Sequence, residues 1–292
     1  MNRSPNRMRG FAVAVVCAST LAVSAGSLVT TAGAAPAAPA ATICPAAAGN
    51  ARFVRQIFLQ ILSRCPDGKA APYWTQRLNN GLSRYAFAEA VDTSAENLVK
   101  NNAIPIYEGI LGRAPTTTEI KAVAAHIIAE HEDGKINATL VSLDEFYNKI
   151  PGATPAAKDQ AWLTQAYMGI VDRAPDGAGR TFFTGVLHAN SATSTVASRY
   201  RVAELLERSL ENAHGWTGAV FGAGLNRAPD RAGFAYWVNW LTGVGKWQTF
   251  RLWTHILSSN EGYALAQTQP NPQQPSAAKR SRSGLGAYNL GR

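Results

Sequence analysis

The stretch FLQILSRCPD, residues 58–67, decides the fold because its pattern returns three times in the chain. An aromatic residue stands six positions before an arginine, an aliphatic residue stands two positions before it, and Pro-Asp begins two positions after it. The pattern returns as YEGILGRAPT (107–116), YMGIVDRAPD (167–176) and FGAGLNRAPD (221–230), and the second copy lacks the Asp. Such self-similarity is the signature of a repeat architecture.

Each copy of the pattern predicts a corner between two helices. The aromatic and aliphatic residues are four positions apart and so share one helix face. We expect that helix to end at the arginine, the proline to open the next helix, and the Asp to lie in its first turn. Because these residues recur, we interpret them as structural anchors of each copy: Arg64, Arg113, Arg173, Arg227, Asp67, Asp176 and Asp230.

A second helix is predicted after each corner. Ten residues after the arginine come Trp74, Phe183 and Trp237, and a leucine follows four positions later in the same three copies. A turn with glycine, such as Asn80-Gly81, then leads to a third helix. The first and fourth copies end on a Ser-x-Glu pattern, at residues 94–96 and 259–261, and the second and third copies have looser forms at 142–145 and 209–211. No stretch alternates with period two, so we predict an all-α protein.

The repeat and the composition together predict the domain organisation. Residues 1–34 resemble a signal peptide and 35–49 an N-terminal arm. Residues 50–150 and 156–266 are expected to be two helical halves that pack on each other, each with two degenerate helix-turn-helix units. The stretch 151–155 between them is rich in Pro and Gly. Residues 267–292, rich in Gln, Pro and Ser, are expected to be a flexible basic tail.

The net charge of +9 gives no indication of nucleic-acid binding. Of the 28 Lys and Arg residues, three lie in the predicted signal and four in the tail, so the predicted folded part holds 21 against 19 acidic residues. The excess therefore lies in the ends of the chain and not on one face. The predicted leader has too short an apolar run to remain as a membrane span. We expect a secreted protein, extracellular or bound to the cell wall.

Two cysteines, Cys44 and Cys65, remain after removal of the predicted leader. We predict a disulfide between them, because exported proteins keep such bonds. The bond would close a loop of roughly 20 residues and stabilise the fold by about 3 kcal/mol. If residues 50–64 form a helix, residues 44–49 must fold back along it, and Gly49-Asn50 is the expected place for the reversal.

The repeated residues resemble those of the secreted bacterial domain-of-unknown-function family numbered forty-two fourteen. The resemblance spans most of residues 50–266 and is clearest in the first and fourth copies. It implies a small helical module found in exported and surface-associated proteins, distantly like the linker domains of phycobilisomes. It implies no catalytic residues. Two departures are Cys65, where the other copies have Ala, and the missing Asp of the second copy.

No residue pattern of a known catalytic or metal site is found. His126 and His131 are five positions apart, about 140° around a helix, so they do not make the paired zinc ligands of a helical motif. One carboxylate in each turn falls far short of a calcium site. There is no nucleophile elbow and no phosphate-binding glycine loop. We therefore predict no metal, no cofactor and no catalytic residue, although a carboxylate pair assembled in space leaves no such pattern.

Five of the seven tryptophans fall in the fourth copy. Trp240 stands three positions after Trp237, where it either faces outward or packs between the two halves. With Tyr236 and Trp247 it is our candidate for stacking on a sugar ring or docking a partner helix. The basic stretch 279–282 is a second candidate contact, to anionic wall polymers, or a solvated tail without a partner.

Three functions are compatible with these features. The first is a secreted, non-catalytic helical protein that binds another protein or a cell-wall glycan at the cell envelope or outside the cell. The second is an envelope hydrolase with an unrecognised pair of carboxylates. The third is a structural envelope protein that self-associates through its aromatic-rich end. The repeated pattern and the absence of a catalytic motif favour the first.

Overall fold

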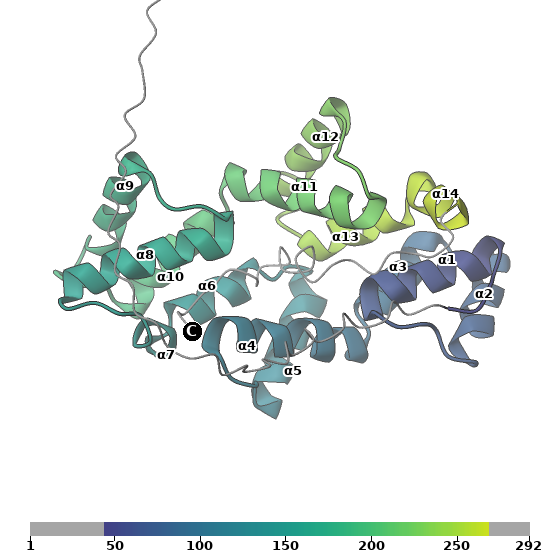
Figure 1. The fold of residues 1–292 in the computed structure, drawn as a ribbon, viewed down its shortest axis with the longest axis horizontal. Coiled ribbons are helices and arrows are strands. Elements are labelled where there is room, and N and C mark those ends of the chain that lie inside the picture. The colour runs from purple at the N-terminus through teal and green to yellow at the C-terminus, as the bar shows by residue number, and fades with distance from the viewer. Residues whose placement is uncertain (1–43, 269–292) are drawn as a thin grey trace, which may run out of the picture. The chain divides into compact units, whose positions relative to one another are not determined.

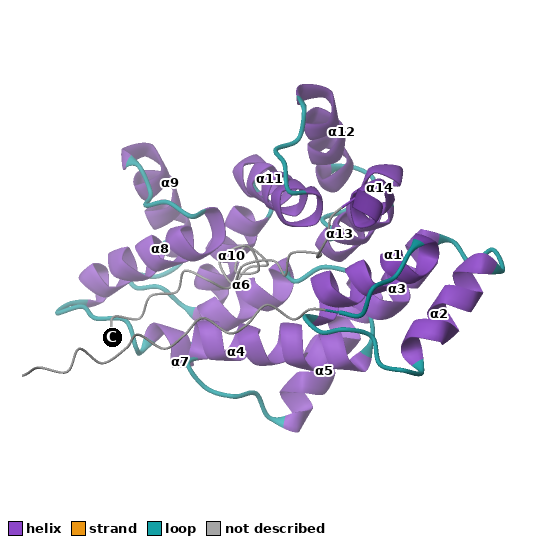
Figure 2. Ribbon diagram, turned by 45° about the vertical axis from the view of Figure 1, so that its right-hand side comes forward, coloured by secondary structure: helices purple, strands orange, loops and turns teal. Residues whose placement is uncertain are grey.

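The computed structural model describes residues 44–268, and within this range all regular secondary structure is helical, as predicted (Figure 2). The predicted signal at 1–34, most of the predicted arm and nearly all of the predicted tail lie outside the described residues. The last helix reaches Thr268, one residue past Gln267.

Four units follow one another along the chain, each with three helices that we name A, B and C in order (Figure 1). The A helices are α1 (Gly49–Ile57) continued by the π-helical η1 (Phe58–Leu62), then η2 (Asn97–Ala103) continued by α4 (Ile104–Leu111), α8 (Pro155–Val171) and α11 (Leu210–Leu225). The B helices are α2 (Ala70–Asn79), α5 (Thr117–Glu130), α9 (Gly177–Leu187) and α12 (Arg231–Thr242). The C helices are α3 (Arg84–Asp92), α6 (Gly134–Ser142), α10 (Val196–Glu207) and α13 (Thr249–Ser258). The short α7 (Asp144–Tyr147) follows the second unit, and α14 (Asn260–Thr268) follows the fourth.

Each A helix ends two residues earlier than predicted. Its last residue is the aliphatic one of the repeated pattern, and the residue between it and the arginine has a left-handed backbone. These residues are Ser63, Gly112, Asp172 and Asn226, with φ of 59°, 63°, 59° and 55°. A left-handed residue is a common helix stop because it turns the chain away from the helix axis. The arginine therefore lies beyond the helix, free to bond elsewhere.

Each B helix begins later than predicted, because the proline lies outside it. In the third and fourth units the third residue after the arginine is the N-cap: the side chains of Asp176 and Asp230 accept hydrogen bonds from the backbone N–H of Gly179 and Gly233, at 2.7 and 2.9 Å. In the first unit α2 begins at Ala70, after Lys69, and Asp67 lies just before the helix, where it accepts hydrogen bonds from the backbone N–H of Lys69 and Ala70. In the second unit Thr116 takes this position and accepts from Glu119 N, which makes the capping box expected there. The second unit is thus not missing its cap, since a threonine provides it.

The B helices lie at the periphery of the described part of the chain, and α9 and α12 project on the same side in both views (Figures 1 and 2). They bury few side chains: Leu78 in α2, Leu187 in α9, and two each in α5 and α12. The repeated aromatic of these helices, at Trp74, Phe183 and Trp237, is half-buried against the cores. One face of each B helix is therefore open to solvent.

The C helices join the two halves. The second unit's α6 packs on the third unit's α10, and the first unit's α3 packs on the fourth unit's α13. The largest core accordingly runs from Leu98 to Leu206, on both sides of 151–155. A second core combines the first unit with Leu257 and Ala266, and a third belongs to the fourth unit. The expected halves therefore pack on each other through shared cores.

The described end of the predicted arm, residues 44–48, is joined to the first unit by a disulfide between Cys44 and Cys65, as predicted, with Cα atoms 5.5 Å apart. The first helix begins at Gly49, whose φ of 55° marks the expected reversal. The guanidinium of Arg55 donates to the carbonyl oxygens of Cys44 and Pro45, so these two residues also bond to α1 directly.

Candidate functional site

The four repeated arginines make the same ion pair in every unit. Arg64 donates from Nε and Nη2 to the two carboxylate oxygens of Glu96, at 2.8 and 2.6 Å. The corresponding pairs are Arg113–Glu145, Arg173–Glu211 and Arg227–Glu261. Three of these glutamates end a Ser-x-Glu pattern, and Glu145 ends the longer stretch 142–145. Each lies in the helical segment that follows the C helix. The arginine thus ties the end of one A helix to the start of the next helical segment.

Two further contacts recur at each corner. The guanidinium lies over the aromatic ring six residues earlier, at 5.4 Å from Phe58, 5.3 Å from Tyr107, 5.2 Å from Tyr167 and 5.1 Å from Phe221. Its Nη1 donates to the backbone carbonyl of the next residue. The hydrogen bonds raise the pKa of Arg64 and lower that of Glu96.

These contacts give the repeated arginines a structural use. Each guanidinium is held by a carboxylate in a bidentate pair, a carbonyl and a ring, which fixes the direction in which the B helix leaves the A helix. In the second unit Arg113 also bonds Glu119, at 2.8 and 3.0 Å. Sequence reasoning found both the arginine and the Ser-x-Glu pattern but did not pair them, because more than 30 residues separate the two.

Residues 45–101 match the family model described as a domain of unknown function, DUF4214. The predicted resemblance is therefore confirmed over this range. The DUF4214 match begins beside Cys44 and ends after Glu96, so it encloses the whole first unit together with its Arg64–Glu96 pair. No curated protein and no solved structure matches the chain. The family's description names no activity.

Of the three predicted binding residues, Tyr236 and Trp240 belong to one aromatic cluster. Tyr236 on α12 is 60% exposed and meets the ring of Trp237 edge-on, with centroids 5.0 Å apart. Trp237 and Trp240 both pack on His255 of α13, which in turn lies 4.5 Å from Tyr85 of α3. We call these five residues the aromatic cluster. It joins the fourth unit to the first, with Tyr236 as its outermost ring.

Electrostatics favour an uncharged aromatic cluster. Burial, followed by the charge of Arg251, lowers the pKa of His255, so its imidazole is neutral at pH 7. Burial raises the pKa of Tyr85 to about 12. The rings of His255 and Tyr85 therefore pack as uncharged aromatic groups, and His255 contacts both Trp237 and Trp240 on the side facing α13.

Trp247 lies apart from this chain of rings. It follows α12 in a loop where its φ is 64°, and the guanidinium of Arg208 lies 5.8 Å from the centre of its ring. Trp240 and Trp247 both pack against the core of the fourth unit, as do Trp216, Trp237 and Trp253. The tryptophans of the fourth unit therefore mainly build its core, and Tyr236 is the most exposed of the predicted binding residues.

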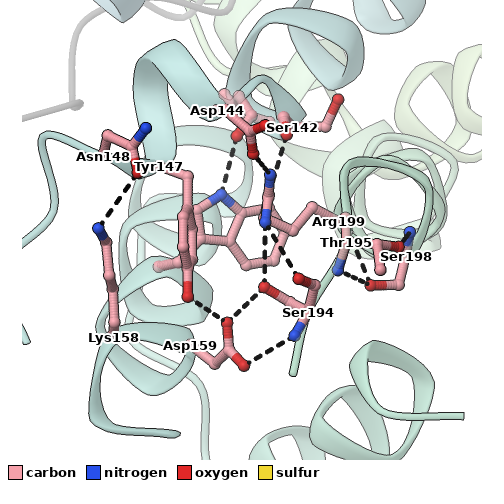
Figure 3. Close-up of polar contacts among 12 residues, drawn as sticks. Ser142, Asp144, Tyr147, Asn148, Lys158, Asp159, Ser194, Thr195, Ser198 and Arg199 are labelled. Atoms are coloured by element: carbon pink, nitrogen blue, oxygen red, sulfur yellow. Dashed lines mark hydrogen bonds and ion pairs between the residues drawn. The ribbon is translucent and has the colours of Figure 1, made fainter. Parts of the chain in front are cut away.

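A buried polar cluster around Asp159 is a site that the sequence analysis did not find (Figure 3). Its carboxylate, on α8, accepts hydrogen bonds from the hydroxyls of Tyr147 and Ser194, from Ser194 N at 3.1 Å, and contacts His188 Nε2 at 2.8 Å. The buried guanidinium of Arg199 donates to Ser194 Oγ, and also to Ser142 O and Asp144. Elements of the second and third units meet here.

The hydrogen bonds of this cluster stabilise the carboxylate of Asp159, and they do not activate the Ser194 hydroxyl as a nucleophile. In a serine hydrolase the hydroxyl contacts a histidine base, and the histidine contacts the acid. Here Ser194 and His188 both contact Asp159, on different oxygens. Burial alone would raise the pKa of Asp159, but the hydrogen bonds from Ser194, His188 and Tyr147 lower it. A carboxylate so well stabilised is a weak base, so the cluster's contribution is to join two units.

The histidines and acids of residues 44–268 form no group of three or more arranged to hold a metal ion. His126 lies half-buried on α5, and burial lowers its pKa. In the same described range no helix has both the length and the apolar character that a membrane span requires.

Proposed function

We propose that this chain is an exported, non-catalytic helical protein that binds a protein or glycan partner at the cell envelope or outside the cell. The leader-like first 34 residues and the Cys44–Cys65 disulfide support export, because such bonds persist in oxidising compartments. The repeated Arg–Glu pairs support a non-catalytic role, because their charges are used to hold the corners between helices.

The observation that carries the proposal is the aromatic cluster. Tyr236 presents a large ring to solvent, and the rings beneath it are held by the core, so little conformational entropy is lost when a partner covers it. Exposed aromatic rings on a rigid support are typical of recognition surfaces.

Retention on an envelope preparation tests this proposal. The full chain is incubated with washed cell envelopes, and the bound fraction is measured by sedimentation for wild type, Tyr236→Ala and a control, Ile128→Ala. Ile128 is also an exposed apolar side chain on a B helix, at 53%. We expect Tyr236→Ala to weaken retention and Ile128→Ala to leave it unchanged. Equal retention of all three, or none for wild type, contradicts the proposal.

A further inference from the structure

The ring of Tyr236 has a counterpart in two other units. Nine residues after the arginine stand Tyr73, Phe182 and Tyr236, and their side chains are 52%, 61% and 60% exposed. Each meets the half-buried aromatic residue that follows it, with centroids 4.9, 4.9 and 5.0 Å apart and interplanar angles of 76°, 82° and 84°. The same pair of rings in the same geometry is thus built three times, on α2, α9 and α12. We call these pairs the aromatic doublets.

The doublets hold their outer rings in place. The inner ring packs against a core, and the outer ring rests on it edge-on, a favoured arrangement of two aromatic groups. Small residues precede the outer ring on the same helix face: Ala70, Gly179 and Gly233 stand three positions before it. These three positions therefore leave the outer ring uncovered on that side.

The three helices that carry the outer rings have polar residues beside the rings and no acidic residue of their own. Three positions after the ring, on the same face, stand the exposed carboxamides Gln76 in the first unit and Asn239 in the fourth. The sequences of α2, α9 and α12 contain no Asp or Glu, and each contains one arginine. In α2 the guanidinium of Arg77 lies 5.8 Å from the centre of the Tyr73 ring.

The small exposed area of each doublet favours a sugar over a protein as its binding partner. One aromatic side chain offers about 150–250 Å², whereas a stable protein interface needs about 800 Å² from each partner. The outer rings stand on three separate helices, so each helix offers a single exposed ring at this position. A pyranose is matched to such a surface, because its C–H face packs on a ring while its hydroxyls bond to carboxamides at the edge.

We infer that the aromatic doublets of α2, α9 and α12 are equivalent binding sites for the sugar rings of a glycan chain. The inference rests on the proposed function and names the chemical class of its partner. The absence of acids on the three helices suits neutral chains and chains with acidic groups alike. The helices α9 and α12, which carry two of the doublets, project on the same side (Figures 1 and 2). A polymer with repeating sugars therefore gains affinity by contacting more than one doublet.

Binding to purified polysaccharides tests the inference. The full chain is titrated against insoluble chitin, cellulose, protein-stripped cell-wall glycan and cross-linked polygalacturonate, which separate neutral from acidic chains. The variants are Tyr73→Ala, Phe182→Ala, Tyr236→Ala and the triple variant, with Ile128→Ala as the matched control. Circular dichroism checks that each variant keeps its helices, which we expect because the changed side chains are exposed.

We expect at least one polymer to bind, each single variant to weaken binding about fivefold, and the triple variant to weaken it by more than about 50-fold. Ile128→Ala should bind as wild type does. Binding to none of the polymers, or equal binding by wild type and the triple variant, overturns the inference. If envelopes retain the chain through Tyr236 while all four polymers fail, the inference is wrong and the proposed function stands. If the envelopes fail as well, both are wrong.

Discussion

Replacing Asp92 by Asn should make the stability of the protein less sensitive to a rise in pH from 5 to 8. Asp92 closes α3 and is buried against α13, where its carboxyl faces Asn97 at 3.0 Å and the hydroxyl of Thr254 at 3.3 Å. Thr254 also bonds to Phe250 O at 2.9 Å. One hydroxyl proton cannot serve both oxygens, so the network is best satisfied when a neutral Asp92 donates to Thr254. Burial accordingly raises its pKa from 3.8 to about 7.

The sign of the effect follows from this raised pKa. Above pH 4 the unfolded chain releases the Asp92 proton, while the folded chain keeps it up to about pH 7, so wild-type stability falls as the pH rises through this window. One pKa unit corresponds to about 1.4 kcal/mol, and two units lie between pH 5 and 7. An asparagine keeps a neutral donor toward Thr254 and has no such dependence. Between pH 5 and pH 8 the free energy of unfolding of the variant should therefore rise by about 2–3 kcal/mol relative to that of wild type.

Thermal unfolding at pH 5 and pH 8 measures this gain. For a domain of this size about 2–3 kcal/mol corresponds to a rise of roughly 4–12 °C in Tm relative to wild type. Glu108→Gln, which neutralises an exposed acid, is the control and should show no pH-dependent difference. Contributions of the histidines, of Asp133 and of Glu207 cancel in the comparison with wild type. An equal difference between Asp92→Asn and wild type at both pH values would refute the reasoning.

Three further predictions concern the corners and the disulfide. Arg113→Gln leaves two carboxylates side by side and should lower the free energy of unfolding by about 1–2 kcal/mol in urea titrations, a loss that shrinks at high salt. Thr116→Ala removes an N-cap and should cost about 1 kcal/mol, with faster hydrogen exchange in the first turn of α5; unchanged exchange would argue against the cap. Replacing Cys44 and Cys65 by Ser should cost about 3 kcal/mol, and a reducing agent should then have no further effect on Tm.

The sequence predicts local features better than it predicts which distant residues contact each other. The all-helical fold, the recurring corner and the Cys44–Cys65 pair all follow from patterns within some 20 residues. The Arg64–Glu96 pair crosses 32 residues, and no local spacing indicates which acid meets which arginine. The Asp159 cluster is assembled from α6, α7, α8, α10 and the segment 188–194, so no local sequence pattern indicates it. Tyr73 and Phe182 directly precede the predicted aromatics Trp74 and Phe183. The aromatic residue nine positions after the arginine is a sequence signal that indicates them.

The helix ends show why some local expectations also failed. A proline suits the first turn of a helix, and an arginine suits the last, so the pattern Arg-x-Pro-Asp predicts two helices that nearly touch. In the structure a left-handed residue stops the first helix and an N-cap starts the second, so Arg and Pro fall in the loop between them. Propensity places a residue near a helix end, but only the backbone turn decides on which side it lies.

The four units separate the residues that make the shape from those that make the surface. The second unit keeps the arginine, its glutamate, the ring under the guanidinium and an N-cap, yet Ala122 stands where the other units have the outer ring. Its B helix also carries Glu119 and Glu130, whereas the other B helices carry no acid. Because this outer position is exposed and lies outside the corner, a change there costs the fold little. The same scaffold therefore presents an aromatic face in three units and omits it in one, which is how a repeat can vary the number of its contacts without changing its architecture.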